Sequence, residues 1–183
     1  MLGMGWDKGV DFESALKLIL KNRAYAREFV RPRLLRAMNV ALLQLINGLR
    51  ISEALECYYK FLLTKERHIT VRVRKSRDRY RVCIIPEIID NTDIALTRNL
   101  RPVTVSSIKT IIYKRLGVNT HSLRYAFINK LLASGVDVAT VSKIVAHKKL
   151  DTLLTYVQEK RAREELEGLV KNVDKEVRRL LKA

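Results

Sequence analysis

The sequence has few residues that could hold a metal ion. It contains two cysteines, Cys57 and Cys83, and three histidines. The cysteines are distant from each other and no zinc-binding spacing occurs, so the sequence predicts chemistry that needs neither a bound metal nor a cofactor. Cys57 lies in an apolar helical stretch and Cys83 in an expected strand. We interpret both as small core residues.

Long apolar runs and acidic residues are also scarce. No run approaches the roughly 18 apolar residues that span a bilayer, and the first residues have no signal-peptide pattern. Only 19 Asp and Glu stand against 36 Lys and Arg, which gives a formal net charge of +17. An excess of this size attracts polyanions. The composition therefore favours a cytoplasmic protein that binds DNA or RNA; a soluble protein with a charged surface is the alternative.

Glycine is rare outside the first ten residues. Three of the seven glycines fall within residues 1–10, which we expect to form a flexible tail or linker. Residues 11–183 are expected to form a single domain, because 48% of the chain is hydrophobic and its 183 residues suffice for one core. Apolar residues recur mostly at helical spacing, so the predicted fold class is α+β, mostly helical, with a small antiparallel β-sheet.

In the first half of the chain, residues typical of helix starts and ends mark three expected helices. Helices are expected over 12–30 and 33–46, interrupted by Pro32. Gly48 suits the left-handed position that follows a helix end. Ser52 is expected to cap the next helix, with Glu53 near its positive end.

The second half continues the helical pattern. Thr104 is expected to cap a helix that ends at Gly117, another helix follows His121, and Asp137 and Asp151 are expected to cap two more. The last 25 residues carry an apolar stripe at helical spacing: Leu166, Leu169, Val173, Val177, Leu180 and Leu181. This stripe is expected to dock on a second copy of the chain or on its own domain.

Residues 68–85 have the alternation of a β-hairpin. Val71 and Val73 alternate with arginines, and after a polar tip Tyr80, Val82 and Ile84 alternate with other residues. Residues 70–81 hold one acidic residue and six basic ones: Arg72, Arg74, Lys75, Arg77, Arg79 and Arg81. A hairpin with this charge is expected to grip phosphates, and Arg72, Arg74, Arg77 and Arg79 are its candidate DNA-binding residues. A solvated charged hairpin is the alternative.

Five polar residues stand out from the apolar pattern: Arg50, His121, Arg124, His147 and Tyr156. Arg50 follows a buried helix and is expected to pair with a carboxylate such as that of Glu53. His121 and Arg124 lie three positions apart at a helix start, where their side chains share a face and an anion is favoured. Taken singly, each of the five is more often a core or surface residue than a catalytic one.

Together these residues resemble the motifs of the tyrosine recombinases, or integrases. The segment Gly48-Leu49-Arg50-Ile51-Ser52-Glu53 is similar to their first arginine motif, and His121-Ser122-Leu123-Arg124 to their H-x-x-R box. Ala146-His147 and Thr152 to Tyr156 resemble their terminal histidine–tyrosine motif. His147 follows His121 by 26 positions and Tyr156 follows His147 by nine, as is typical of the family. The resemblance covers about residues 33–157.

The resemblance implies a reaction and a role for each residue. Tyr156 would attack a DNA phosphodiester and form a 3′-phosphotyrosyl intermediate, which keeps the bond energy for rejoining. Arg50 and Arg124 would bind the phosphate oxygens. His121 is the candidate general base and Lys75 the candidate general acid.

Two further expectations come from the resemblance. His147 would hydrogen-bond the phosphate, whereas Glu53 is expected to be structural. The implied partner is a double-stranded DNA attachment site, on which the chain would assemble into a dimer or tetramer.

The chain departs from the family pattern in three places. Ala146 stands where the family commonly has glycine, and no glycine follows Lys75. The N-terminal domain that usually closes a clamp around DNA is expected to be absent. Three alternatives stay open: a type IB topoisomerase, which shares this constellation, a non-catalytic DNA-binding protein, and a basic protein that binds RNA.

Overall fold

The computed structural model describes residues 10–73, 79–146, 166–173, 175 and 178–179. The expected tail at 1–9, the hairpin tip and the segment 147–165 lie outside these residues. The order of the elements is α1 (Phe12–Glu28), α2 (Pro32–Asn47), α3 (Ile51–Thr64), β1 (His68–Arg72), β2 (Tyr80–Ile84), α4 (Asn91–Thr97), α5 (Val105–Leu116), α6 (Thr120–Ala133) and α7 (Val138–Val145). The described part is mostly helical with one small antiparallel sheet, which confirms the predicted fold class.

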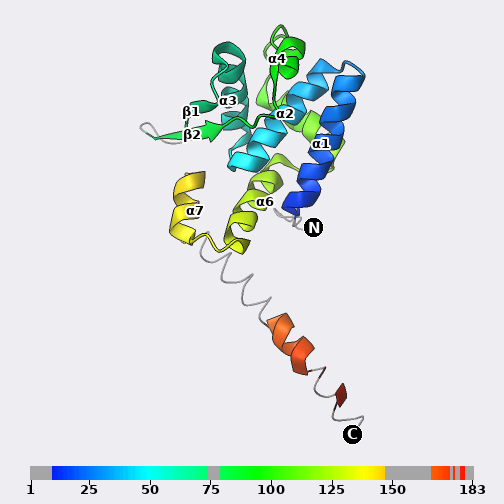
Figure 1. Cartoon of the computed structure of the whole chain (residues 1–183), viewed down its shortest axis with the longest axis vertical. Helices are drawn as coiled ribbons and strands as arrows, with labels where there is room; N and C mark the ends of the chain where they lie inside the picture. The colour runs from blue at the N-terminus through cyan, green and yellow to red at the C-terminus, as the bar shows by residue number, and fades with distance from the viewer. Residues whose placement is uncertain (1–9, 74–78, 147–165, 174, 176–177, 180–183) are drawn as a thin grey trace, which may run out of the picture.

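Helix α2 forms the centre of the domain. Every residue from Leu34 to Leu45 on it is buried, because α1, α3, α4, α5 and α6 all pack around it (Figure 1). The helix begins with Pro32, whose missing N–H is harmless at that position. It ends at Gly48 in the left-handed conformation, as the sequence predicted.

A buried polar network ties the first four helices together. Arg23 on α1 is 3% exposed and donates to Asn39 on α2 at 2.6 Å and to Asp93 on α4 at 3.0 Å. Asn39 in turn donates to the Tyr58 hydroxyl on α3 at 3.1 Å, which lies 2.8 Å from the Thr97 hydroxyl. A buried ion pair with its hydrogen bonds satisfied fixes the register of the helices around it.

The β1–β2 hairpin pairs His68 with Ile84 and Arg72 with Tyr80, as the alternation predicted. In β2 the alternating apolar residues do not face the core. Tyr80, Val82 and Ile84 are exposed, and Arg81 and Cys83 point inward. The register of the hairpin explains this, because it pairs Cys83 with Ile69 and Arg81 with Val71, the buried residues of β1.

The two cysteines lie next to each other in the core. Cys57 on α3 and Cys83 on β2 are fully buried and not joined by a disulfide. The hydrogen bond with the Cys83 thiol, and burial, raise the pKa of Cys57 well above its ordinary value. Both are therefore small core residues, as the sequence predicted, and they hold the hairpin against α3.

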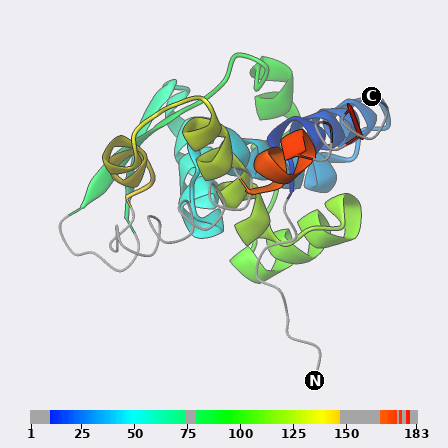
Figure 2. The same ribbon diagram turned by 90° about the horizontal axis from the view of Figure 1, so that it is seen from below.

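The later helices begin where their capping residues predicted. Thr104 accepts a hydrogen bond from the Ser107 amide and Asp137 from the Thr140 amide. Helix α6 begins one residue before His121 and is capped by Asn119. Helix α7 packs on α6 and lies on the same side of the domain as the hairpin in both views (Figure 2).

Residues 166–173 form a helix that extends away from the body of the domain (Figure 1). Four apolar side chains on it are exposed: Leu166, Leu169, Val170 and Val173. Among the described residues, no single helix is long and apolar enough to cross a membrane; α2 and α3 reach that length only as a pair bent by 114°.

Candidate active site

Arg50 is held in place by Glu53 at the start of α3. The Arg50 guanidinium donates from Nη1 to Glu53 Oε1 at 2.9 Å, and the Arg50 backbone amide donates to Oε2 at 3.0 Å. Glu53 is 1% exposed, whereas the Arg50 side chain keeps 27% of its surface in solvent. The expected pairing is therefore confirmed. Arg50, and not Ser52 as predicted, is the N-cap residue of α3. The Glu53 side chain, three positions later, accepts the hydrogen bond of the Arg50 backbone amide.

Gly48 lies where the end of α2 meets Phe127 of α6 and Val145 of α7, and a side chain at this position would be strained. Its φ is +58°, and a Cβ atom would lie 2.3 Å from Cδ1 of Phe127 and 3.1 Å from Cγ1 of Val145. The close approach brings its carbonyl oxygen within reach of α6. The turn before Arg50 is thus fixed by tertiary packing.

Arg124 is the buried arginine of the site, at 3% exposure. It donates from Nη1 to the Gly48 carbonyl at 2.6 Å and from Nη2 to the Val145 carbonyl at 2.8 Å. Burial, and then repulsion by Arg50 and Arg81, lowers the pKa of Arg124 to about 10. The guanidinium stays charged at neutral pH. The negative charge of a phosphate beside it would offset the cost of burial and the repulsion by Arg50 and Arg81.

Arg81 is a site residue that the sequence interpretation missed. It was counted only as a hairpin charge, but its side chain points inward and is 8% exposed. It donates to the carbonyl oxygens of Asn47 and Gly48 and lies 3.8 Å from Glu53 Oε2. Burial lowers the pKa of Arg81, and the negative charge of Glu53 partly offsets this lowering. The only sequence signal for Arg81 was its position in the strand alternation, on the opposite face from Tyr80 and Val82.

Arg50, Arg81 and Arg124 together form what we name the arginine cluster. Arg81 and Arg124 donate to the Gly48 carbonyl, and Arg50 and Arg81 pair with one carboxylate, that of Glu53. Three cations and one anion leave a formal charge of +2 at this corner. Two of the three also contact the last carbonyls of α2, the negative end of that helix. The arrangement favours an anion with several oxygens, such as a phosphate.

His121 lies at the start of α6, three positions before Arg124, with its ring centroid 5.8 Å from that of Tyr125. Partial burial, and then the charges of Arg124, Lys109 and Arg50, lower the pKa of His121 below its ordinary value. The imidazole is therefore neutral at pH 7, as a general base requires.

The remaining predicted site residues fall into two groups. Arg72 and Arg79 are exposed at the hairpin, on β1 and just before β2. Lys75, Arg74, Arg77, His147 and Tyr156 lie outside the described residues. Ala146, which precedes His147, ends α7 with a φ of +49°, and this left-handed conformation explains why a glycine suits the position.

The described residues hold no group of three or more His, Cys, Asp or Glu side chains placed to bind a metal ion. The polar side chains that converge in this region are the arginine cluster, Glu53 and His121. Such a set is suited to binding an oxyanion and transferring a proton.

The sequence is similar to two proteins that carry the name "Putative integrase". One, from Acidianus two-tailed virus, is 35% identical over 169 residues, covering 90% of this chain and 68% of that protein. The other, from Sputnik virophage, is 30% identical over 198 residues, covering 85% and 86%. An uncharacterised protein of Methanocaldococcus jannaschii is 29% identical over 198 residues, covering 90% and 88%. No family model matches the chain.

Two solved structures share the fold. The crystal structure of XerA recombinase has a TM-score of 0.57 at 22% identity, covering 87% of this chain and 64% of the other. That of XerH site-specific recombinase, bound to its palindromic difH substrate in a post-cleavage complex, has a TM-score of 0.59 at 20% identity, covering 87% and 52%. With the two integrase relatives, these likenesses show that the chain belongs to the tyrosine recombinase (integrase) family, the enzymes of site-specific DNA recombination.

Proposed function

We propose that this chain cuts and rejoins double-stranded DNA at an attachment site through a covalent bond to Tyr156. The phenolic oxygen attacks the phosphorus, the bond from phosphorus to the 5′ oxygen breaks, and a 3′-phosphotyrosyl link and a free 5′-hydroxyl result. Attack by a 5′-hydroxyl then reverses the step. The bond energy is conserved in the intermediate, so rejoining needs no nucleoside triphosphate.

The arginine cluster is the single observation that carries this proposal. Negative charge grows on the non-bridging phosphate oxygens in the transition state, and fixed cations stabilise it most. Arg50 and Arg124 are fixed by their bonds to Glu53, Gly48 and Val145. The guanidinium groups are therefore oriented before the substrate arrives.

The proton transfers are assigned to His121, beside this cluster, and to Lys75, which lies outside the described residues. His121, with its lowered pKa, takes the phenolic proton of Tyr156, whose ordinary pKa is about 10. Lys75 gives a proton to the leaving 5′ oxygen, and His147 donates a hydrogen bond to the phosphate. Arg72, Arg74, Arg77 and Arg79 on the hairpin bind the DNA backbone.

A covalent-trapping assay tests the chemistry. The protein is mixed with nicked DNA that carries its attachment site, in EDTA, and separated on a denaturing gel. We expect a shifted band that is absent with Tyr156→Phe. Tyr113→Phe, which removes the hydroxyl of an exposed tyrosine on α5, serves as the matched control and retains the band. A band that survives Tyr156→Phe would refute the assignment of the nucleophile.

Assembly on DNA is part of the same proposal. Leu166, Leu169, Val170 and Val173 expose an apolar face on the helix at 166–173, and a second copy of this chain is its proposed occupant. Light scattering of the DNA complex tests this. Leu169→Asp is expected to reduce the complex to one protein per DNA molecule, whereas Lys171→Asp, on the same helix, leaves it assembled. A wild-type protein that stays monomeric on paired sites and relaxes supercoils would favour a topoisomerase instead.

A further inference from the structure

A second group of arginines lies at the opposite end of α2 from the arginine cluster. Arg31, Arg33 and Arg36 surround the beginning of the helix, which has no acidic residue in its first turn and no side-chain cap. The positive end of a helix dipole disfavours cations. Arg31 and Arg33 are exposed to solvent, but Arg36 is buried, so an anion at this end of the helix would be stabilised.

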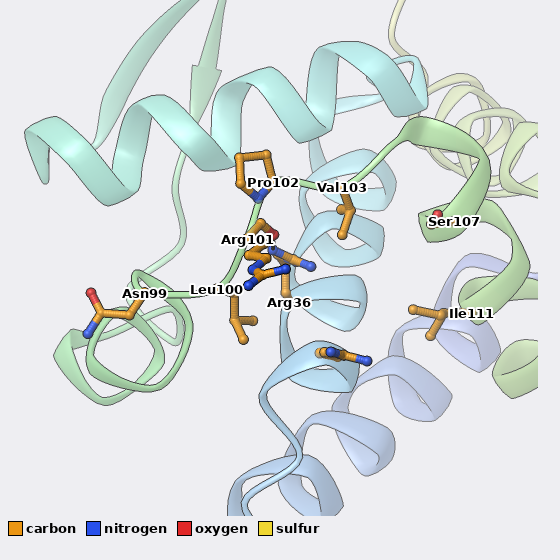
Figure 3. Close-up of a pocket in the computed structure, with 9 residues that line it drawn as sticks. Arg36, Asn99, Leu100, Arg101, Pro102, Val103, Ser107 and Ile111 are labelled. Atoms are coloured by element: carbon orange, nitrogen blue, oxygen red, sulfur yellow. Dashed lines mark hydrogen bonds between the residues drawn. The ribbon is translucent and has the colours of Figure 1, made fainter.

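A cavity of 430 Å³ opens beside these arginines, between α2, the segment 99–103 and α5 (Figure 3). Arg33, Arg36 and Arg101 line it together with the Ser107 side chain, and none of the described residues that line it is acidic. The wall of the cavity thus carries three cations and a hydroxyl.

Arg36 is the residue that points to a ligand. Its side chain is buried, at 2% exposure, and lies against Arg101, whose carbonyl oxygen accepts from Nη1 at 2.8 Å. Its Nε atom is buried without a hydrogen-bond partner, and within the part of the chain that the structure describes no carboxylate pairs with it. Arg23, equally buried at 3%, is paired with Asp93. A buried cation without such a partner is costly.

We propose that this cavity binds a phosphate group. A guanidinium offers a fork of N–H donors that matches a phosphate, and the positive end of the α2 dipole favours an anion at this end of the helix. Arg36 and the end of α2 at Asn47 are separated by about 16 Å of helix, so this group is distinct from the phosphate that reacts. The phosphate belongs either to the DNA backbone away from the cleavage point or to a free phosphate ion.

Binding of inorganic phosphate is tested first, by NMR titration of the ¹⁵N-labelled full chain against chloride of equal ionic strength. We expect amide shifts at residues 33–36 and 99–107 that saturate. Arg36→Met should weaken them about tenfold, as the loss of one charged hydrogen-bonding partner does. Lys21→Met, which removes an exposed cation from α1, should leave them unchanged. Shifts confined to residues 48–52 and 121–124 would overturn the proposal, because they report the arginine cluster alone.

Thermal unfolding separates a ligand site from a structural role. Methionine keeps the aliphatic part of Arg36 and removes the unpaired charge, so Arg36→Met should unfold at the same or a higher temperature without phosphate. It should also gain less stability from phosphate than the wild type. A lower unfolding temperature by the same amount with and without phosphate would show that Arg36 is only structural.

Duplex DNA binding identifies the source of the phosphate. If Arg36→Met weakens DNA binding and reduces its salt dependence by about one charge, the ligand is a backbone phosphate. If only the response to inorganic phosphate is lost, the ligand is a free phosphate ion. A variant that binds both as the wild type does would overturn the proposal. Because Tyr156 takes no part in binding, Tyr156→Phe should respond like the wild type, which keeps this test independent of the catalytic one.

Discussion

Arg124 donates a hydrogen bond of 2.6 Å to the carbonyl oxygen of Gly48, which lies 76 positions earlier in the chain. The bond joins the H-x-x-R segment on α6 to the turn that precedes Arg50. Two motifs that are remote in sequence are thereby held at one corner.

Replacing Gly48 by alanine should disrupt the corner. The left-handed backbone costs a β-carbon about 1 to 2 kcal/mol, and the contact with Phe127 adds about 1 to 3 kcal/mol of overpacking. Urea unfolding measures the sum. Gly117→Ala is the matched control, since Gly117 has a φ of +69° but nothing within 4 Å of the added atom. Equal losses in the two variants would show that the Phe127 contact is unimportant.

Replacing Arg124 by lysine should reduce strand cleavage about 100-fold or more. A lysine lacks the planar fork with which the guanidinium bonds the Gly48 and Val145 carbonyls, so its ammonium group is not held in the same orientation. The rate of covalent-complex formation measures the effect, with Arg98→Lys, an exposed arginine at the end of α4, as the control. Cleavage within about threefold of the wild type would contradict a role for the fixed fork.

Replacing Glu53 by glutamine should destabilise the protein by about 3 kcal/mol, because Arg50 and the buried Arg81 lose the carboxylate that they share. Glu56→Gln removes a carboxylate three positions along the same helix, where the pair with Lys60 is largely exposed. Its effect should stay within about 0.5 kcal/mol. Chemical unfolding of the two variants makes the comparison, and similar losses would argue against the buried pairing.

Stability should fall as the pH is lowered through the ordinary pKa of histidine. The folded protein lowers the pKa of His121, so the unfolded chain binds more protons there between the folded and the unfolded pKa. Stability is therefore complete above about pH 6.5 and is lost below it. His121→Asn should remove this part of the dependence. Thermal unfolding between about pH 5 and 8 measures it, and an unchanged profile in the variant would exclude His121 as its source.

Local signals in the sequence predicted most of the helices correctly. Thr104 and Asp137 begin their helices because their side chains accept amide hydrogen bonds that any helix start leaves open. Gly48 ends α2 because its conformation is cheap only for glycine. These interactions span three or four positions and need no tertiary partner. Helix α4 has no apolar period, and the sequence interpretation did not find it.

The site was predictable only in part. Arg50, His121 and Arg124 were singled out by motif spacing, and the structure brings Arg50 and Arg124 to one corner with Glu53 between Arg50 and Arg81. Their catalytic roles, and those of Lys75, His147 and Tyr156, stay predictions. Arg81 was not found, because a period of two marks a strand but does not say which face is buried.

The sequence by itself determined the element types, the basic charge and the spaced motifs, since all of these depend on neighbours along the chain. The tertiary structure alone decided that Arg81 turns inward and that Arg36 lies buried with no carboxylate partner among the residues that the structure describes. Arg81 turns inward because Asn47, Gly48 and Glu53 offer it acceptors at the negative end of α2. Acceptors of this kind come from segments remote in sequence, and only packing brings them together.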